Sequence, residues 1–184
     1  MSLEFEIPLV SLIFILILNI VYFSKKRADL EENKPYKVIL ISSLIVATID
    51  TVIHIICSAN TFESIVNNYY TLLNYLNKIL SALFSVIFSS LFFYTLLITY
   101  DKVRKNPKKI STILIIANIV FSVIMLFTNI ELVDAKVATN VTGATTMLGY
   151  AMVAIMLTCS LLVALTNIKK LDKRYLPIFI VFLL

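Results

Sequence analysis

The sequence is poor in glycine and in charged residues. Its 184 residues include two glycines, and only 15% are charged. So few glycines argue against extensive turn-rich β structure, and a soluble globular domain has about 25% charged residues. Because 60% of the residues are hydrophobic, a water-soluble fold of this length could not bury them. The composition therefore predicts an all-α membrane protein.

Histidine and cysteine are also scarce. The chain has one histidine, His54, and two cysteines, Cys57 and Cys159. This set argues against a zinc site of His and Cys ligands, and the expected depths of the two cysteines differ by about 20 Å, which is beyond disulfide reach. The sequence also lacks a phosphate-binding glycine loop and the GxSxG and HExxH motifs. We expect no metal, no cofactor and no catalytic residue in this segment.

Long apolar runs dominate what is present. A membrane-spanning helix needs about 20 apolar residues, and five runs qualify, at residues 7–24, 38–58, 79–100, 110–129 and 144–168. A sixth run, YLPIFIVFLL at 175–184, has ten residues, about half a span. We expect residues 1–184 to form a single transmembrane domain. It is an antiparallel helical bundle with five full spans and a truncated sixth, and part of a longer protein.

Lysine and arginine gather in alternate connections between these runs. Segments 25–37, 101–109 and 169–174 hold fourteen of the 16 basic residues, and only Lys78 and Lys136 lie elsewhere. Short cytoplasmic loops of membrane proteins carry such an excess, so we expect these segments to be cytoplasmic and the N-terminus external, in a multi-pass protein of the cell membrane. This distribution is not a nucleic-acid signal. The residues that set the orientation are Lys25, Lys26, Arg27, Arg104, Lys105, Lys108, Lys109, Lys169, Lys170, Lys173 and Arg174.

Asp50 and His54 interrupt the second apolar run, in the stretch LIVATIDTVIHIIC at 44–57. Four residues apart, they share one face of a helix. A charged acid near the middle of a span costs about 2.5–3.5 kcal/mol, which predicts that Asp50 is protonated, has a partner or lies in a wet cavity. Besides His54, the candidate partners on the other spans are Ser85, Ser89, Asn118, Thr146 and Tyr150.

Three interpretations of this polar group stay open. It is a static hydrogen-bonded clasp between helices, a site that responds to a ligand or a proton, or part of a transport pathway. The last is disfavoured because the spans show no series of charges and no paired broken helices. A further candidate lies outside the membrane at 59–78, where apolar residues at near-helical spacing alternate with asparagines. That stretch predicts an interfacial helix, whose tyrosines form either an aromatic belt at the headgroup level or the wall of an outward-facing ligand site.

Several short motifs resemble one family. The run YFSKKRADLEENKPYKVILI at 22–41, Asp50 in the second span, YDK at 100–102 and KKLDKRYLPIFIV at 169–181 resemble the N-terminal six-span membrane sensor region of sensor histidine kinases from Gram-positive bacteria. Related modules also precede diguanylate cyclase domains. The resemblance implies that the sixth helix continues into a cytoplasmic catalytic domain, and that the receptor is a homodimer through the full-length protein.

The resemblance therefore implies a membrane-embedded sensory module that contacts the bilayer, recognises an unknown small ligand or peptide, and signals to an output domain. Two other classes stay open: a fragment of a small-solute transporter or channel, and a scaffold without a ligand. The sequence that follows Leu184 would separate a receptor from a transporter, since only a receptor predicts a cytoplasmic enzyme there.

The predicted orientation can be tested by cysteine labelling from outside the cell. A membrane-impermeant thiol reagent should reach a cysteine placed at position 68 or 136, because both positions lie in external segments. It should not reach one at position 105, which lies in a basic cytoplasmic segment. Labelling at position 105 alone would contradict the orientation.

Overall fold

The computed structural model describes residues 3–24, 33–60, 62–100, 103, 105–135 and 138–167. Within these ranges, five helices are long and apolar enough to cross a membrane. They are α1 (Leu3–Ser24), α2 (Asn33–Ala59), α4 (Tyr70–Thr99), α6 (Pro107–Phe127) and α7 (Ala144–Thr166). The prediction of an all-α helical bundle is confirmed. The truncated sixth span at 175–184 lies outside the described residues.

Helices α2 and α4 begin well before the apolar runs that predicted them. Helix α2 begins at Asn33 because its polar first turn is also helical, and Pro35 there lacks only an N–H that a first turn does not need. Helix α4 begins at Tyr70 because the asparagine-rich stretch before the apolar run continues into the same helix. At about 1.5 Å per residue, the 30 residues of α4 reach about 45 Å, which exceeds the hydrocarbon core of a bilayer.

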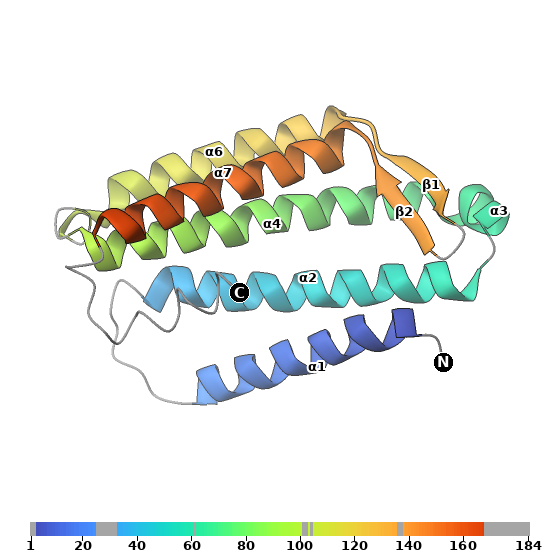
Figure 1. Ribbon diagram of the computed structural model, residues 1–184, viewed down its shortest axis with the longest axis horizontal. Coiled ribbons are helices and arrows are strands. Elements are labelled where there is room, and N and C mark those ends of the chain that lie inside the picture. Colours follow the sequence, from blue (N-terminus) through green and yellow to red (C-terminus); the bar gives the residue numbers. More distant parts are fainter. Residues whose placement is uncertain are drawn as a thin grey trace.

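Helix α4 is the centre of the bundle. It packs against α2, α6 and α7, while α1 packs on the other side of α2. The successive layers α1, α2 and α4, with α6 and α7 beyond, are visible in Figure 1. The buried face of α4 includes Ser85, Ser89, Thr95 and Thr99. Small residues of this kind let transmembrane helices approach closely, which explains why three helices share this one.

Close approach is also visible where α7 meets α4 and α6. Gly149 on α7 is buried, and a methyl group in its place would lie 3.5 Å from both the Met125 methyl group and the Ser81 side chain. That distance is ordinary van der Waals contact, so the absence of a longer side chain at position 149 permits α7 to lie against both neighbours.

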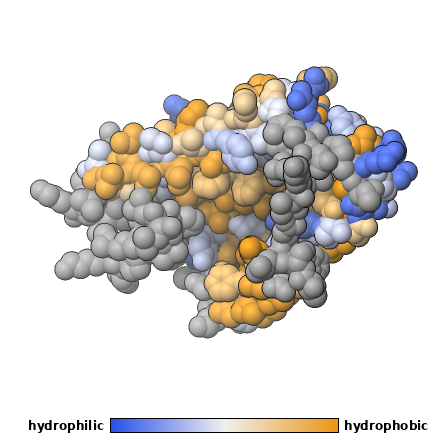
Figure 2. Space-filling view, turned by 45° about the vertical axis from the view of Figure 1, so that its right-hand side comes forward, coloured by the Kyte–Doolittle hydropathy of each residue, from blue (hydrophilic) through white to orange (hydrophobic). Residues whose placement is uncertain are grey.

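The outer surface of the bundle is apolar. Phe14 on α1 is 62% exposed, Ile119 on α6 is 57% exposed and Phe127 is 84% exposed. Figure 2 shows hydrophobic residues over the flank of the bundle and hydrophilic residues gathered toward the end where α3 lies. An exposed apolar surface of this extent is what a bilayer covers. The chain is a multi-pass membrane protein.

The helix ends sort the connections into two groups. The C-termini of α1, α4 and α7 and the N-termini of α2 and α6 lie at one end of the bundle, which we call the basic end because of the sequence next to these termini (Figure 1). In the sequence, the lysine- and arginine-rich segments join or follow these termini. Near this end, the rings of Tyr22, Tyr36 and Tyr94 connect α1, α2 and α4, with centroids 5.0 Å and 6.2 Å apart. That this end faces the cytoplasm stays a prediction.

The opposite end carries a small cap. It comprises α3 (Phe62–Ser64), the π-helical turn η1 (Ile65–Tyr69) and an antiparallel hairpin of β1 (Glu131–Ala135) and β2 (Ala138–Thr142). The hairpin was not predicted from the sequence. A two-stranded hairpin is marginal alone, and here β2 contacts α2 and α7. The Tyr70 hydroxyl also donates to the Ile130 carbonyl oxygen at 3.2 Å, which ties α4 to the residue before β1.

Gly143 connects β2 to α7. Its φ of 114° lies in the region that residues with a side chain rarely adopt, and a Cβ atom there would lie 2.8 Å from the Asn129 carbonyl oxygen. The asparagine-rich stretch at 59–78, predicted to be an interfacial helix, is helical through α3, η1 and the first turns of α4. Its role as the wall of a ligand site stays a prediction.

Candidate functional site

The structure separates the predicted polar group into two parts, and the first is a cluster between α4 and α6. The Ser85 hydroxyl donates to Asn118 Oδ1 at 2.6 Å, and Asn118 Nδ2 donates to Ser89 Oγ at 2.7 Å. The same Nδ2 donates to the Leu114 carbonyl oxygen at 2.9 Å, and Ser89 Oγ donates to the Ser85 carbonyl oxygen at 2.7 Å. Both amide hydrogens of Asn118 are therefore used, which is the arrangement of a structural clasp.

The second part is the pair Asp50 and His54 on α2. His54 Nε2 lies 3.8 Å from Asp50 Oδ1, and the two side chains are 38% and 45% exposed, respectively. The distance exceeds that of a hydrogen bond. In the part of the chain that the structure describes, this contact is the only polar side-chain contact of either residue. Neither side chain contacts the Asn118 cluster through a hydrogen bond.

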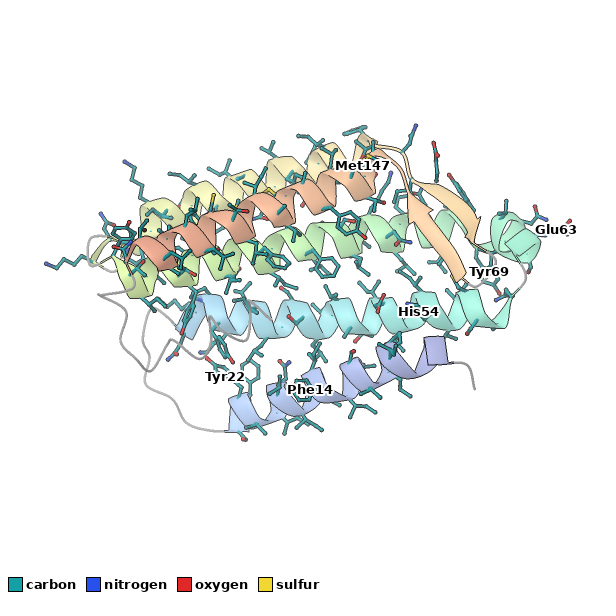
Figure 3. The ribbon with its side chains drawn as sticks, in the orientation of Figure 1. Phe14, Tyr22, His54, Glu63, Tyr69 and Met147 are labelled. Atoms are coloured by element: carbon teal, nitrogen blue, oxygen red, sulfur yellow. The ribbon has the colours of Figure 1, made fainter. Side chains whose placement is uncertain are left out.

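The position of the pair follows from the length of α2. Asp50 lies about 26 Å from the start of the helix at Asn33 and about 14 Å from its end at Ala59. Figure 3 shows His54 in the half of α2 that leads toward the cap, whereas Tyr22 on α1 lies near the basic end. The single acid of the second apolar run and the only histidine of the chain thus lie together on a partly exposed face.

The two candidates on α7 lie apart from both groups. Tyr150 is 72% exposed, and Thr146 is half-buried. The neighbouring Thr145 is fully buried instead, and its hydroxyl lies 2.7 Å from the Thr128 hydroxyl and donates to the Asn129 carbonyl oxygen at 3.2 Å. To predict which of the two threonines faces the interior of the bundle, one must know how α7 is rotated about its axis. The positions of the polar residues in the sequence do not determine that rotation.

Sequence reasoning missed several polar contacts between elements. Asn19 Nδ2 on α1 donates to the Leu40 carbonyl oxygen on α2 at 3.2 Å, and Asn167 Nδ2, directly after α7, donates to the Tyr100 hydroxyl at 3.0 Å. Lys78 is buried, and its Nζ donates to the Leu126 carbonyl oxygen near the C-terminus of α6 at 3.0 Å, where a cation suits the helix dipole. The cost of a polar group in an apolar span could have pointed to Asn19.

A groove lies between α2, α4 and α6, with a volume of about 510 Å³. Its walls are mostly apolar, with Val86 and Phe93 from α4 and Ile119 from α6. Ser89 and Asn118 lie along it, and Lys34 lies at its basic end. Neither Asp50 nor His54 lines it. A volume of this size is typical of sites for small apolar or amphiphilic molecules.

The remaining predicted residues are distributed as follows. Lys105, Lys108 and Lys109 are exposed at the basic end of the bundle. The other predicted orientation residues lie outside the described residues: Lys25, Lys26, Arg27, Arg104, Lys169, Lys170, Lys173 and Arg174. Among the described residues, no three His, Cys, Asp or Glu side chains gather as they would around a metal ion, and Cys57 and Cys159 are not joined by a disulfide.

The clasp predicts energetic coupling between Ser85 and Asn118. A double-mutant cycle of Ser85→Ala and Asn118→Ala should give a coupling of about 0.6 kcal/mol in the free energy of unfolding, the usual value for such bonds in membranes. The free energies of unfolding are measured by steric trapping in bicelles. A matched cycle of Ser85→Ala with Ser122→Ala, on the same helix as Asn118, should be additive. Additivity in both cycles would contradict the clasp.

Comparison with protein-family models, with curated proteins and with solved structures finds no match to this chain. The proposal for its function therefore rests on three features of its own residues. These are the Asp50–His54 pair on α2, the polar contacts that connect the helices, and the motifs at 22–41, 100–102 and 169–181.

Proposed function

We propose that this chain is the membrane-embedded sensory module of a larger receptor, a sensor histidine kinase, and that it passes a stimulus from outside or within the membrane to a cytoplasmic output domain. The observation that carries the proposal is the Asp50–His54 pair, 3.8 Å apart on one face of α2. Histidine is the side chain whose charge changes between about pH 5 and 8. A pair that includes it can hold two charge states.

The chemistry of the pair provides a switch. When His54 is protonated, its positive charge favours the ionised carboxylate of Asp50, and the two groups attract each other. When His54 is neutral, that attraction is lost, and an ionised acid in a span becomes costly. A proton, or a ligand that binds one of these states better, shifts the population between them.

The contacts of α2 provide a route from the pair to the basic end. Tyr36 on α2 contacts Tyr94 on α4, with ring centroids 6.2 Å apart. Farther along, Tyr100 after α4 accepts a hydrogen bond from Asn167 after α7. A change in how α2 packs on α4 can therefore reach the end of α7, directly before the basic segment at 169–174 that resembles the start of the helix leading to a kinase domain. We propose that α7 and the segment after it form the mobile pair.

A scaffold without a ligand is the second candidate, and the Asn118 cluster favours it. That cluster has all its amide donors hydrogen-bonded within the protein, as a static clasp requires. The two candidates differ at Asp50, because a scaffold does not need a group that changes charge.

The proposal predicts that the charge of Asp50 is required for signalling. In the full-length protein, Asp50→Asn keeps a hydrogen-bonding side chain but cannot ionise, so kinase output should become fixed in one state whatever the stimulus. His54→Gln should shift output in the same assay. Output is measured as autophosphorylation in membranes between about pH 5 and 8, with a panel of candidate stimuli.

The matched control is Thr51→Val on the same helix. Thr51 is buried and donates to the Ala47 carbonyl oxygen at 2.7 Å, so its loss should affect stability and leave the response intact. An Asp50→Asn protein that still responds normally would remove the pair from the mechanism. A full-length protein without a cytoplasmic output domain would overturn the receptor proposal as a whole.

A further inference from the structure

We propose that the groove between α2, α4 and α6 holds an acyl chain of an anionic phospholipid, with the phosphate of its headgroup at Lys34. This inference concerns binding of a membrane lipid at a defined place. It goes beyond the proposed sensory role and does not depend on it.

The dimensions of the groove suit a lipid chain. On α6 its lining runs from Ser111 to Leu126, about 22 Å along the helix axis. One leaflet of the hydrocarbon core is about 15 Å deep. The groove therefore extends from the basic end past the depth of one leaflet, and its volume of about 510 Å³ can hold a long chain.

The chemistry of its walls favours hydrocarbon over a polar solute. Val86, Phe93 and Ile119 supply apolar surface. Of the polar side chains along the groove, Asn118 and Ser89 lie near its middle and already use their donors within the protein, at 2.7–2.9 Å, whereas Ser90, Ser111 and Ser122 add only single hydroxyl groups to the lining. A polar ligand would have to break these bonds, and each hydrogen bond lost in an apolar setting is costly. An acyl chain makes no such demand, because it offers no donor or acceptor.

The charge at one end selects the headgroup. Lys34 is exposed and lies at the basic end of the groove. The N-termini of α2 and α6 lie at the same end, and the positive ends of helix dipoles attract anions. Lys108 and Lys109, exposed in the first turn of α6, add positive charge. A phosphate without a compensating amine, as in phosphatidylglycerol, complements this end better than zwitterionic phosphatidylcholine.

The chain contains no tryptophan, so a single introduced tryptophan is the only source of tryptophan fluorescence and reports on its own surroundings. A single tryptophan is placed in the groove by Phe93→Trp, and the full chain is reconstituted in vesicles of phosphatidylcholine or phosphatidylglycerol with brominated acyl chains, which quench tryptophan fluorescence on contact. Competition between the two lipids should give a several-fold preference for the anionic one at position 93. The control is Phe14→Trp on the 62% exposed outer face of α1, where the preference should be near one.

Lys34→Gln in the Phe93→Trp background should lower the ratio of preference for the anionic over the zwitterionic lipid toward one. Both brominated lipids should still quench the fluorescence of the tryptophan. A second reporter, Leu114→Trp on the α6 side of the groove, keeps the test available if the Phe93 variant fails to fold. Equal quenching by both lipids at the groove would mean ordinary boundary lipid and would overturn the proposal. Absence of quenching by either lipid would mean that protein covers the groove, from this chain or a second copy, and would also overturn it.

Discussion

Polar side chains in the spans must find hydrogen-bond partners within the protein, because the bilayer core contains no water, and the arrangement of the helices depends on this constraint. Thr95 and Ser160 satisfy it locally, each donating to the carbonyl oxygen four residues earlier. Asn19 and Asn118 satisfy it across helices and thereby join α1 to α2 and α4 to α6. Where α7 meets α4, a glycine and small side chains permit close packing instead. The central place of α4 follows from these contacts.

Asp50 and His54 differ from these residues, and this difference is why they carry the proposed function. A threonine bonded to its own helix has one protonation state and one favourable geometry. The pair on α2 has two ionisable groups, partly exposed and 3.8 Å apart, so its interaction depends on protonation. The groove, which is lined in part by Ser89 and Asn118 of the α4–α6 clasp, has no ionisable group except Lys34 among its lining residues. The pair proposed to sense protons and the groove proposed to bind a lipid therefore share no residue.

The spans were predicted well from the sequence because a run of about 20 consecutive apolar residues is seldom anything other than a membrane-spanning helix. The sequence did not predict where α2 and α4 begin. Their first turns are helical but polar, so they lie outside the apolar runs from which the spans were predicted. The hairpin was missed because the short stretch at 130–143 was treated as a loop, although β-branched Val133, Thr139 and Val141 favour strands. For the site, the four-residue spacing of Asp50 and His54 correctly predicted that the two side chains lie on the same face of α2. Their separation from Ser85, Ser89 and Asn118 was not predictable, because periodicity within one helix does not tell which helix lies opposite.

The central claim is that the Asp50–His54 pair changes its charge state in the membrane, and one measurement tests it directly. Because His54 is the only histidine, the protein labelled with ¹⁵N-histidine gives the ring signals of one residue in bilayers. The account predicts that these signals change between about pH 5 and 8, and that the midpoint of the change differs in Asp50→Asn. Ring signals that stay constant over that range, or an identical midpoint in the two proteins, would contradict it.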